Sequence, residues 1–244
     1  MRGRALLLVG VGLLLVLIAA SIASAVTTPG GISSYYAAVI QAPTRTAIFV
    51  YPAISGPKPP GVSGATYFDR IAIGTLIGLE INPQYHTQDT NSRSPLFINT
   101  ATGQPGTTNT PIVAVGRPTI HAVVYWLEKK SMISPVYYAE DRFRYYFKKR
   151  IDGSTIISQS KTALSYDHFV IYTVTDSAGN TYYVFYGFSF KGSSAATQLL
   201  KYWVGTGQLS SRTSSYEVWK WVDTNRNFRV DPPGVDTYTQ IASG

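Results

Sequence analysis

The stretch Asp167–Phe190 reads DHFVIYTVTDSAGNTYYVFYGFSF, and it decides the fold. β-Branched and aromatic residues fill both halves in the two-residue period that is typical of strands. The intervening Asp176–Asn180 combines an Asp that bonds its own backbone with a Gly and an Asn that accept positive φ, which predicts a tight turn. Large apolar side chains fall on both faces of this hairpin, so we expect both faces to be covered. The stretch therefore predicts a mainly β protein, a two-sheet β-sandwich of the jelly-roll or Ig-like type.

One short helix is predicted after the hairpin, near Ala195–Val204. Its apolar residues recur at the spacing of a helical stripe: Ala196, Leu199, Leu200, Trp203 and Val204. We expect Ser193 or Ser194 to cap its start and Gly205 to end it in a left-handed conformation. The helix is expected to cover a sheet face or close one end of the sandwich.

The rest of the chain is read mostly as strands and loops. Strands are predicted at Tyr35–Ala42, Ala47–Tyr51, Tyr67–Ile81, Ile112–Val115, Thr119–Glu128, Val136–Ile151, Ser154–Ser158 and Tyr216–Val222. Residues 82–111 form a long polar loop with one apolar island, Leu96–Ile98. A loop of this length is either functional or a surface excursion, and we favour the surface excursion.

The first 25 residues form a targeting segment. Arg2 and Arg4 precede an uncharged apolar run, Ala5–Ala25, which ends in the small-x-small sequence Ala-Ser-Ala. This pattern predicts a cleaved signal peptide, although the run is also long enough to remain as a membrane anchor. We expect residues 26–244 to form one β-rich domain. Both readings place this domain outside the cytoplasm, either extracellular or at the cell surface.

The start of the leader also allows a third reading. The Arg2-Gly3 pair before an apolar helix resembles the processing site of archaeal pilins and archaellins. That resemblance implies a helix retained as the core of a filament.

The composition excludes several kinds of chemistry. The chain has no cysteine, so disulfides, thiolate nucleophiles and cysteine metal sites are impossible. Hydrolase and nucleotide-binding motifs such as G-x-S-x-G, H-E-x-x-H and G-x-x-x-x-G-K are absent from the sequence. His86, His121 and His168 have no local metal-ligand spacing and are expected to be ordinary core or surface histidines. A carboxylate pair brought together only in space stays possible.

The chain carries 21 basic and 13 acidic residues, a net charge of +8. This excess suits weak attraction to anionic surfaces, but it does not by itself predict a nucleic-acid partner. Its densest part is a basic strand at 142–150, in which alternate residues fall on one face: Arg142, Arg144, Tyr146, Lys148 and Arg150. These residues predict a site for an anionic polymer, with Tyr146 free to stack. The alternative is a solvated outer face, or an edge strand protected by its charges.

A second candidate site is a calcium loop near the C-terminus. Oxygen-bearing side chains recur at alternate positions, as they do in calcium loops: Asp223, Asn225, Asn227 and Asp231, with Asp236 further on. The stretch resembles EF-hand-like and dockerin-like loops, which implies a bound Ca²⁺. It departs from them at Phe228, where Gly is expected, and at Gly234, where a bidentate acid is expected. A turn built from Asx hydrogen bonds is the alternative.

These features lead to three hypotheses about function. The first is a non-enzymatic structural protein of the cell surface, an envelope or pilin-like filament subunit that associates with itself or with other surface proteins. In one version Tyr35–Tyr51 is a strand donated to a neighbouring subunit. The second is an extracellular binding module for an anionic polymer or glycan at residues 142–150. The third is an extracellular hydrolase with an unrecognised acidic site.

Overall fold

The computed structural model describes residues 30–41, 47–65, 72–76, 85–93 and 96–244. The predicted leader, residues 1–25, and most of Tyr67–Ile81 lie outside the described residues. Within the described part of the chain, no helix combines the length and the apolar character that crossing a membrane requires.

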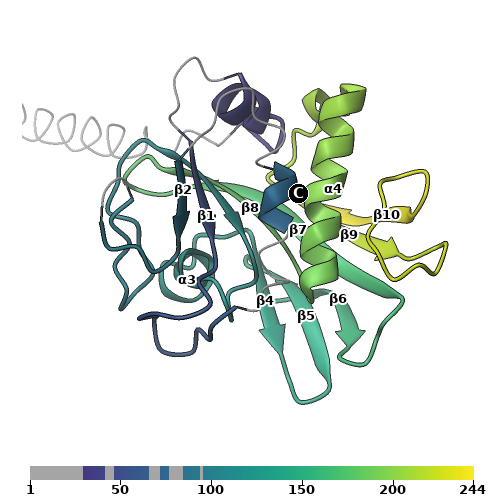
Figure 1. Ribbon diagram of the computed structural model, residues 1–244, viewed down its shortest axis with the longest axis horizontal. Coiled ribbons are helices and arrows are strands. Elements are labelled where there is room, and N and C mark those ends of the chain that lie inside the picture. Colours follow the sequence, from purple (N-terminus) through teal and green to yellow (C-terminus); the bar gives the residue numbers. More distant parts are fainter. Residues whose placement is uncertain (1–29, 42–46, 66–71, 77–84, 94–95) are drawn as a thin grey trace, which may run out of the picture.

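The centre of the fold is a seven-stranded mixed sheet in the order β10-β9-β7-β8-β3-β1-β2 (Figure 1). Its strands are β1 (Ile48–Tyr51), β2 (Tyr85–Gln88), β3 (Pro111–Val115), β7 (Tyr166–Thr175), β8 (Thr181–Gly187), β9 (Tyr216–Val222) and β10 (Thr237–Ser243). β1 runs parallel to β2 and β3, and β3 runs parallel to β8, while the remaining pairs are antiparallel. Parallel neighbours need crossover connections. The protein is therefore mixed α/β, and the prediction of a β-sandwich is wrong.

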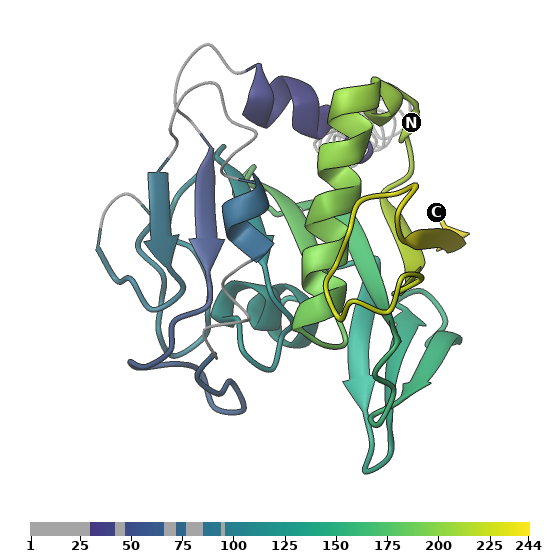
Figure 2. The same ribbon diagram turned by 45° about the vertical axis from the view of Figure 1, so that its right-hand side comes forward.

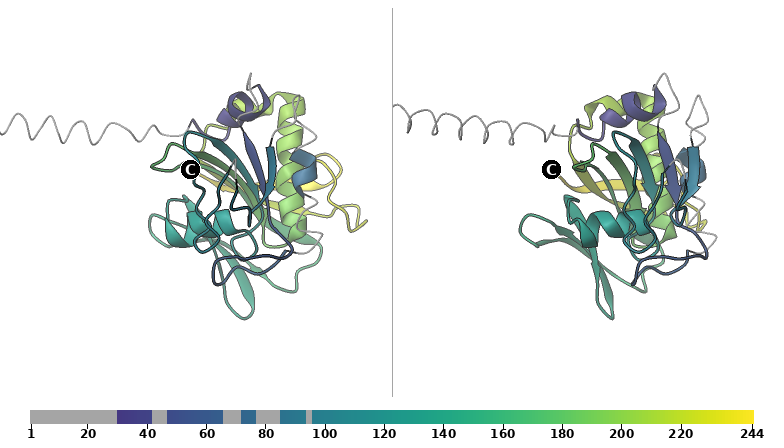
Figure 3. Two further views of the ribbon diagram at one scale, coloured as in Figure 1. Left: turned by 60° about the vertical axis from the view of Figure 1, so that its left-hand side comes forward. Right: turned by 90° about the vertical axis from the view of Figure 1, so that its left-hand side faces the viewer.

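Different layers cover the two faces of this sheet. Helix α4 (Phe190–Thr206) packs on one face, against β7 and β8. Helix α3 (Ala122–Tyr125), with the π-helix η2 (Trp126–Lys130), packs on the opposite face (Figure 3). A separate antiparallel sheet of β4 (Val136–Glu140), β5 (Arg144–Lys149) and β6 (Thr155–Ser160) shares that second face and extends below the main sheet in Figure 1.

The hairpin is β7 and β8, in register from Phe169 opposite Gly187 to Thr175 opposite Thr181. In its turn, the carboxylate of Asp176 accepts hydrogen bonds from the backbone N–H groups of Ala178 and Asn180. Both faces of the hairpin are buried, as predicted. The inference from two covered faces to two packed sheets was wrong, because a helix can bury a sheet face just as effectively as a second sheet can.

Helix α4 includes the predicted Ala195–Val204 but is longer at both ends. Ser189 caps it by accepting a hydrogen bond from the N–H of Lys191, at 3.2 Å, and Gly207 ends it at φ +71°. The predictions of a serine cap at 193 or 194 and of an end at Gly205 are therefore wrong. The cap lies directly at the end of β8, so the chain turns from strand to helix within two residues.

Several predicted strands are helical instead. Tyr35–Ala42 contains the π-helix η1 (Tyr36–Ile40), and the described part of Tyr67–Ile81, residues 72–76, is helical. Thr119–Glu128 contains α3 and the start of η2. Short apolar runs fit a buried helix as well as a strand, and here tertiary packing decides between them.

Three further differences concern strand boundaries. Val136–Ile151 is two strands, because Asp141 accepts hydrogen bonds from the N–H groups of Phe143 and Arg144 and closes a turn. The loop at 82–111 contains β2, and two residues of its apolar island, Leu96 and Ile98, lie in the core, whereas Phe97 between them is exposed. β10 follows the last predicted strand and has no counterpart in the sequence-based expectation.

Candidate functional site

The three-stranded sheet places the predicted basic residues. β5 is its middle strand, so the edge-strand interpretation of this segment is wrong. Pairing sets Tyr137 opposite Lys148 and Tyr146 opposite Ser158. Since paired residues share a face, Arg144, Tyr146 and Lys148 line the outer surface. The other face of β5 turns inward, where the rings of Phe147 and Phe188 stack with centroids 4.2 Å apart.

The two remaining basic residues lie at the ends of β5. Arg142 is in the turn before the strand, with its guanidinium carbon 5.4 Å from the centroid of the Phe143 ring. Arg150 follows the strand and lies 4.3 Å over the Tyr137 ring. It also donates a hydrogen bond to the carbonyl oxygen of Glu128, at 2.7 Å. We call Arg142, Arg144, Tyr146, Lys148 and Arg150 the cationic strip.

Charge is concentrated around this strip. Residues 129–161 contain eight basic and three acidic residues, a net charge of +5, out of +8 for the whole chain. Glu140 is paired with Lys161 at 2.6 Å. Asp141 accepts a hydrogen bond from the Tyr146 hydroxyl, which is the main reason that the pKa of Asp141 is lowered. Two of the three acids therefore lie at one end of the strip. At the other end, Lys148 and Arg150 outnumber the one acid, Asp152, whose carboxylate accepts hydrogen bonds from the N–H and the hydroxyl of Ser154.

The predicted calcium loop is a network of internal hydrogen bonds. The carboxylate of Asp223 accepts from the N–H groups of Asn227 and Phe228. The amides of Asn225 and Asn227 both donate to Asp231, at 2.9 and 2.7 Å. A calcium ion would have to displace these donors.

The fifth predicted ligand, Asp236, is engaged in the same way. It accepts the indole N–H of Trp221 and the backbone N–H groups of Thr224 and Asp231. Among the described residues, no three His, Asp or Glu side chains gather in a manner suited to a metal ion. A bound Ca²⁺ therefore stays a prediction from the sequence alone.

The three histidines lie in different parts of the fold, His86 on β2, His121 before α3 and His168 on β7. Nδ1 of His168 lies 2.7 Å from Oε1 of Gln159, and burial lowers the pKa of His168 to about 4. Nε2 of His121 lies 3.1 Å from the carbonyl oxygen of Val50, and burial also lowers the pKa of His121. Both rings are therefore neutral parts of the core at pH 7.

Sequence reasoning missed a buried ion pair at the carboxyl ends of the parallel strands. Asp89, directly after β2, pairs with Lys58 at 3.0 Å, and both side chains are buried. The same carboxylate accepts the N–H groups of Ala53 and Ala122, at 2.7 Å each. Ligands often bind at this edge of α/β sheets, but here Asp89 ties together the loops after β1, β2 and β3. Only the parallel topology, which the sequence did not suggest, would have located it.

Two more buried acids were missed, and both join layers of the fold. Glu128 accepts the N–H of Tyr138 at 2.8 Å and the hydroxyl of Tyr186 at 2.6 Å, and burial raises its pKa to about 7. Asp167 accepts the N–H groups of Ser189 and Gly192 at the start of α4, and burial raises its pKa to about 6. Their oxygens are occupied by donors of this chain.

Comparison of the chain with protein-family models and with curated proteins gives no match. The function is therefore inferred from the arrangement of the cationic strip and the buried acids.

Proposed function

We propose that this chain is an exported, non-enzymatic module that binds an anionic polymer, such as an acidic or sulfated glycan, on the cationic strip. One observation carries the proposal. Arg144, Tyr146 and Lys148 lie on one outer face of a central strand, beside the Tyr137 ring on which Arg150 stacks.

The spacing of the charges favours a polymer over a small anion. A strand rises about 3.3 Å per residue, so the Cα atoms of Arg144 and Lys148 are roughly 13 Å apart along β5. A chain with repeated negative charges can contact both cations at once, whereas a single phosphate or sulfate cannot. Between them, Tyr146 offers a ring for stacking, with the ammonium of Lys148 5.7 Å from its centroid.

The buried acids support a binding role over hydrolysis. A glycosidase needs two carboxyl groups that reach the substrate from opposite sides of the bond. Asp89, Glu128 and Asp167 are each buried, and their oxygens accept hydrogen bonds from the protein itself. They are placed to hold loops and layers together.

The test is binding to heparin, a sulfated glycan, by the double variant Arg144→Glu/Lys148→Glu. An exposed charge contact contributes about 0.2–1 kcal/mol, and reversal replaces two attractions by repulsions. We expect affinity at 100 mM NaCl to fall at least roughly tenfold. The salt dependence of binding should weaken as well, since fewer counterions are released.

The matched control is Arg226→Glu/Arg229→Glu. It makes the same change in net charge on two exposed residues of the β9–β10 loop. We expect this variant to bind heparin within about twofold of the parent protein, because only diffuse attraction is reduced. Equal losses in both variants would show that total charge, and not the strip, determines binding.

A structural subunit is a second candidate, and the edge strand β10 favours it. β10 pairs with β9 on one side and forms an edge of the seven-stranded sheet. Its sequence, TYTQIAS, has no charge and no proline, which are two of the features that protect an edge, although a bulge between Gln240 and Ala242 interrupts its pairing with β9. Ile241 on this strand is 38% exposed.

The version with a donated strand loses its premise, because Ile48–Tyr51 is β1 and pairs on both sides within its own sheet. Association through β10 would instead extend the sheet between two copies. Light scattering against protein concentration tests it. We expect the parent protein to assemble as its concentration rises and the Ile241→Lys variant to stay monomeric. A parent protein that also stays monomeric would exclude this candidate function.

A further inference from the structure

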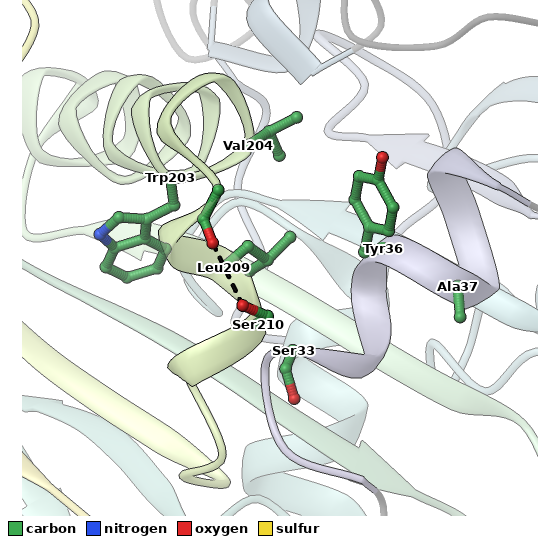
Figure 4. Close-up of a pocket in the computed structure, with 8 residues that line it drawn as sticks. Ser33, Tyr36, Ala37, Trp203, Val204, Leu209 and Ser210 are labelled. Atoms are coloured by element: carbon green, nitrogen blue, oxygen red, sulfur yellow. Dashed lines mark hydrogen bonds between the residues drawn. The ribbon is translucent and has the colours of Figure 1, made fainter.

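The π-helix η1 lies beside the C-terminal end of α4 (Figure 2). An apolar cavity lies between them (Figure 4). Its volume is about 400 Å³, within the range of small-ligand pockets. It is lined by Ser33, Tyr36, Ala37, Trp203, Val204, Gly207, Leu209 and Ser210. Tyr36 lies on one wall, and Val204 and Leu209 lie on the other (Figure 4). The hydroxyl of Ser210 donates a hydrogen bond to the carbonyl oxygen of Gly207, so its proton is already used within the protein. The rest of the lining is mostly apolar.

The position of the cavity along the chain relates it to the predicted anchor. Ser33 in its wall follows Ala25, the last residue of the uncharged apolar run, by eight residues. Eight residues span at most about 29 Å when fully extended. In the form of the protein that keeps Ala5–Ala25 in a bilayer, Ser33 in the cavity wall therefore lies within about 29 Å of the end of the span.

The described residues around the cavity carry a small excess of positive charge. Residues 30–41 contain no charged side chain. Lys201 lies near the C-terminal end of α4, and Arg212, whose guanidinium carbon is 4.5 Å from the centroid of the Trp203 ring, pairs with the buried Glu217 at 3.8 Å. Lys201 is exposed, and Tyr36 at the cavity is 39% exposed. Tyrosine and basic residues are favoured where a protein meets lipid headgroups, and cations attract the anionic ones.

We propose that this cavity holds one acyl chain of a membrane lipid when residues 5–25 anchor the protein. The apolar lining matches the hydrocarbon chain, and the basic surroundings match an anionic headgroup at the opening. The proposal is independent of polymer binding, because the cavity and the cationic strip lie on different elements.

The test uses the full chain in vesicles of phosphatidylcholine and phosphatidylglycerol. Tyr36 is replaced by p-benzoylphenylalanine, whose photoreactive ketone inserts into nearby C–H bonds. After illumination, mass spectrometry should detect a lipid adduct at residue 36. The control places the same residue at Phe228, an exposed ring in the β9–β10 loop, and should give at least fivefold less adduct.

Filling the cavity should remove the adduct without detaching the protein. Val204→Trp and, separately, Ala37→Leu are each combined with the photoreactive residue 36 and checked for folding by circular dichroism. We expect either to lower the adduct yield at least fivefold while flotation with vesicles is unchanged. Four results would each overturn the proposal. The first two are a protein that does not float with the vesicles and a protein that floats but gives no adduct. The other two are equal amounts of lipid adduct from the photoreactive residues 36 and 228, and an adduct of residue 36 only with the protein's own residues 5–25.

Discussion

Replacing the buried acid Glu128 by glutamine should change how stability depends on pH. Burial raises the pKa of Glu128 from 4.5 to about 7 in the folded protein, although hydrogen bonds from Tyr138 and Tyr186 oppose that rise. The folded state thus holds the proton more tightly than the unfolded state. The contribution of Glu128 to the free energy of unfolding is therefore fully present below about pH 4.5 and is lost as the pH rises from there through about 7.

The size of this effect follows from the two pKa values. The gap between 4.5 and about 7 corresponds to a loss of about 3 kcal/mol once Glu128 is ionised. Glutamine keeps an acceptor for the N–H of Tyr138, and its amide can donate to the hydroxyl of Tyr186. The variant Glu128→Gln should therefore keep the contacts and remove the ionisation. We expect it to gain about 3 kcal/mol on the parent protein between pH 4.5 and 8.

Urea denaturation followed by tryptophan fluorescence at several pH values measures this difference. Other groups with shifted pKa values, such as Asp167 and His168, titrate in both proteins and cancel in the comparison. Glu140→Gln, at a partly exposed surface pair, is the control and should show only a small effect. If the free energy of unfolding depended on pH in the same way for Glu128→Gln and the parent protein, the assignment of Glu128 as a buried acid that titrates near neutral pH would be refuted.

Four other outcomes can be checked by thermal or chemical denaturation. Gly205→Ala should stabilise the protein by roughly 0.5–1 kcal/mol, because an added Cβ meets no atom within 4 Å and α4 is still helical there; Gly207→Ala, at φ +71°, should destabilise it by about 1–2 kcal/mol. Gly192→Ala should cost about 1–3 kcal/mol, because its Cβ would lie 2.7 Å from Oδ2 of Asp167. Adding 1 mM Ca²⁺ after EDTA treatment should leave the Tm unchanged, since the oxygens of the predicted loop around Asp223 already accept internal hydrogen bonds; a rise in Tm that Asp223→Asn abolishes would show calcium binding instead.

The sequence was a good guide where local pattern and tertiary contact agree. The hairpin Asp167–Phe190 has alternation, turn residues and burial that all favour the same structure, and β7 and β8 follow it closely. The alternation around Tyr146 likewise places Arg144 and Lys148 on one face. In both places the pattern depends on neighbours along one strand or across one turn, which a single sequence records directly.

The sequence was a poor guide where the outcome depends on distant partners. Val123 and Val124 have strand propensity, yet they lie in α3, because a helix there buries them against the sheet. β1 and β2 are four residues each, and their parallel pairing joins segments 37 residues apart. Asp89 became visible only through that pairing, because its partner Lys58 comes from the loop after β1.

In the proposed binding role, the placement of the cationic strip would lower the entropic cost of holding a polymer. Charges on loops lose conformational freedom when they bind a partner, and that loss reduces affinity. Here the inner face of β5 is fixed to the core through the stacked rings of Phe147 and Phe188. At the end that carries Lys148, Arg150 is held by the carbonyl oxygen of Glu128 and by the Tyr137 ring. The backbone of the strip and one of its cations are therefore already ordered before binding, so less of the electrostatic attraction is offset by entropy.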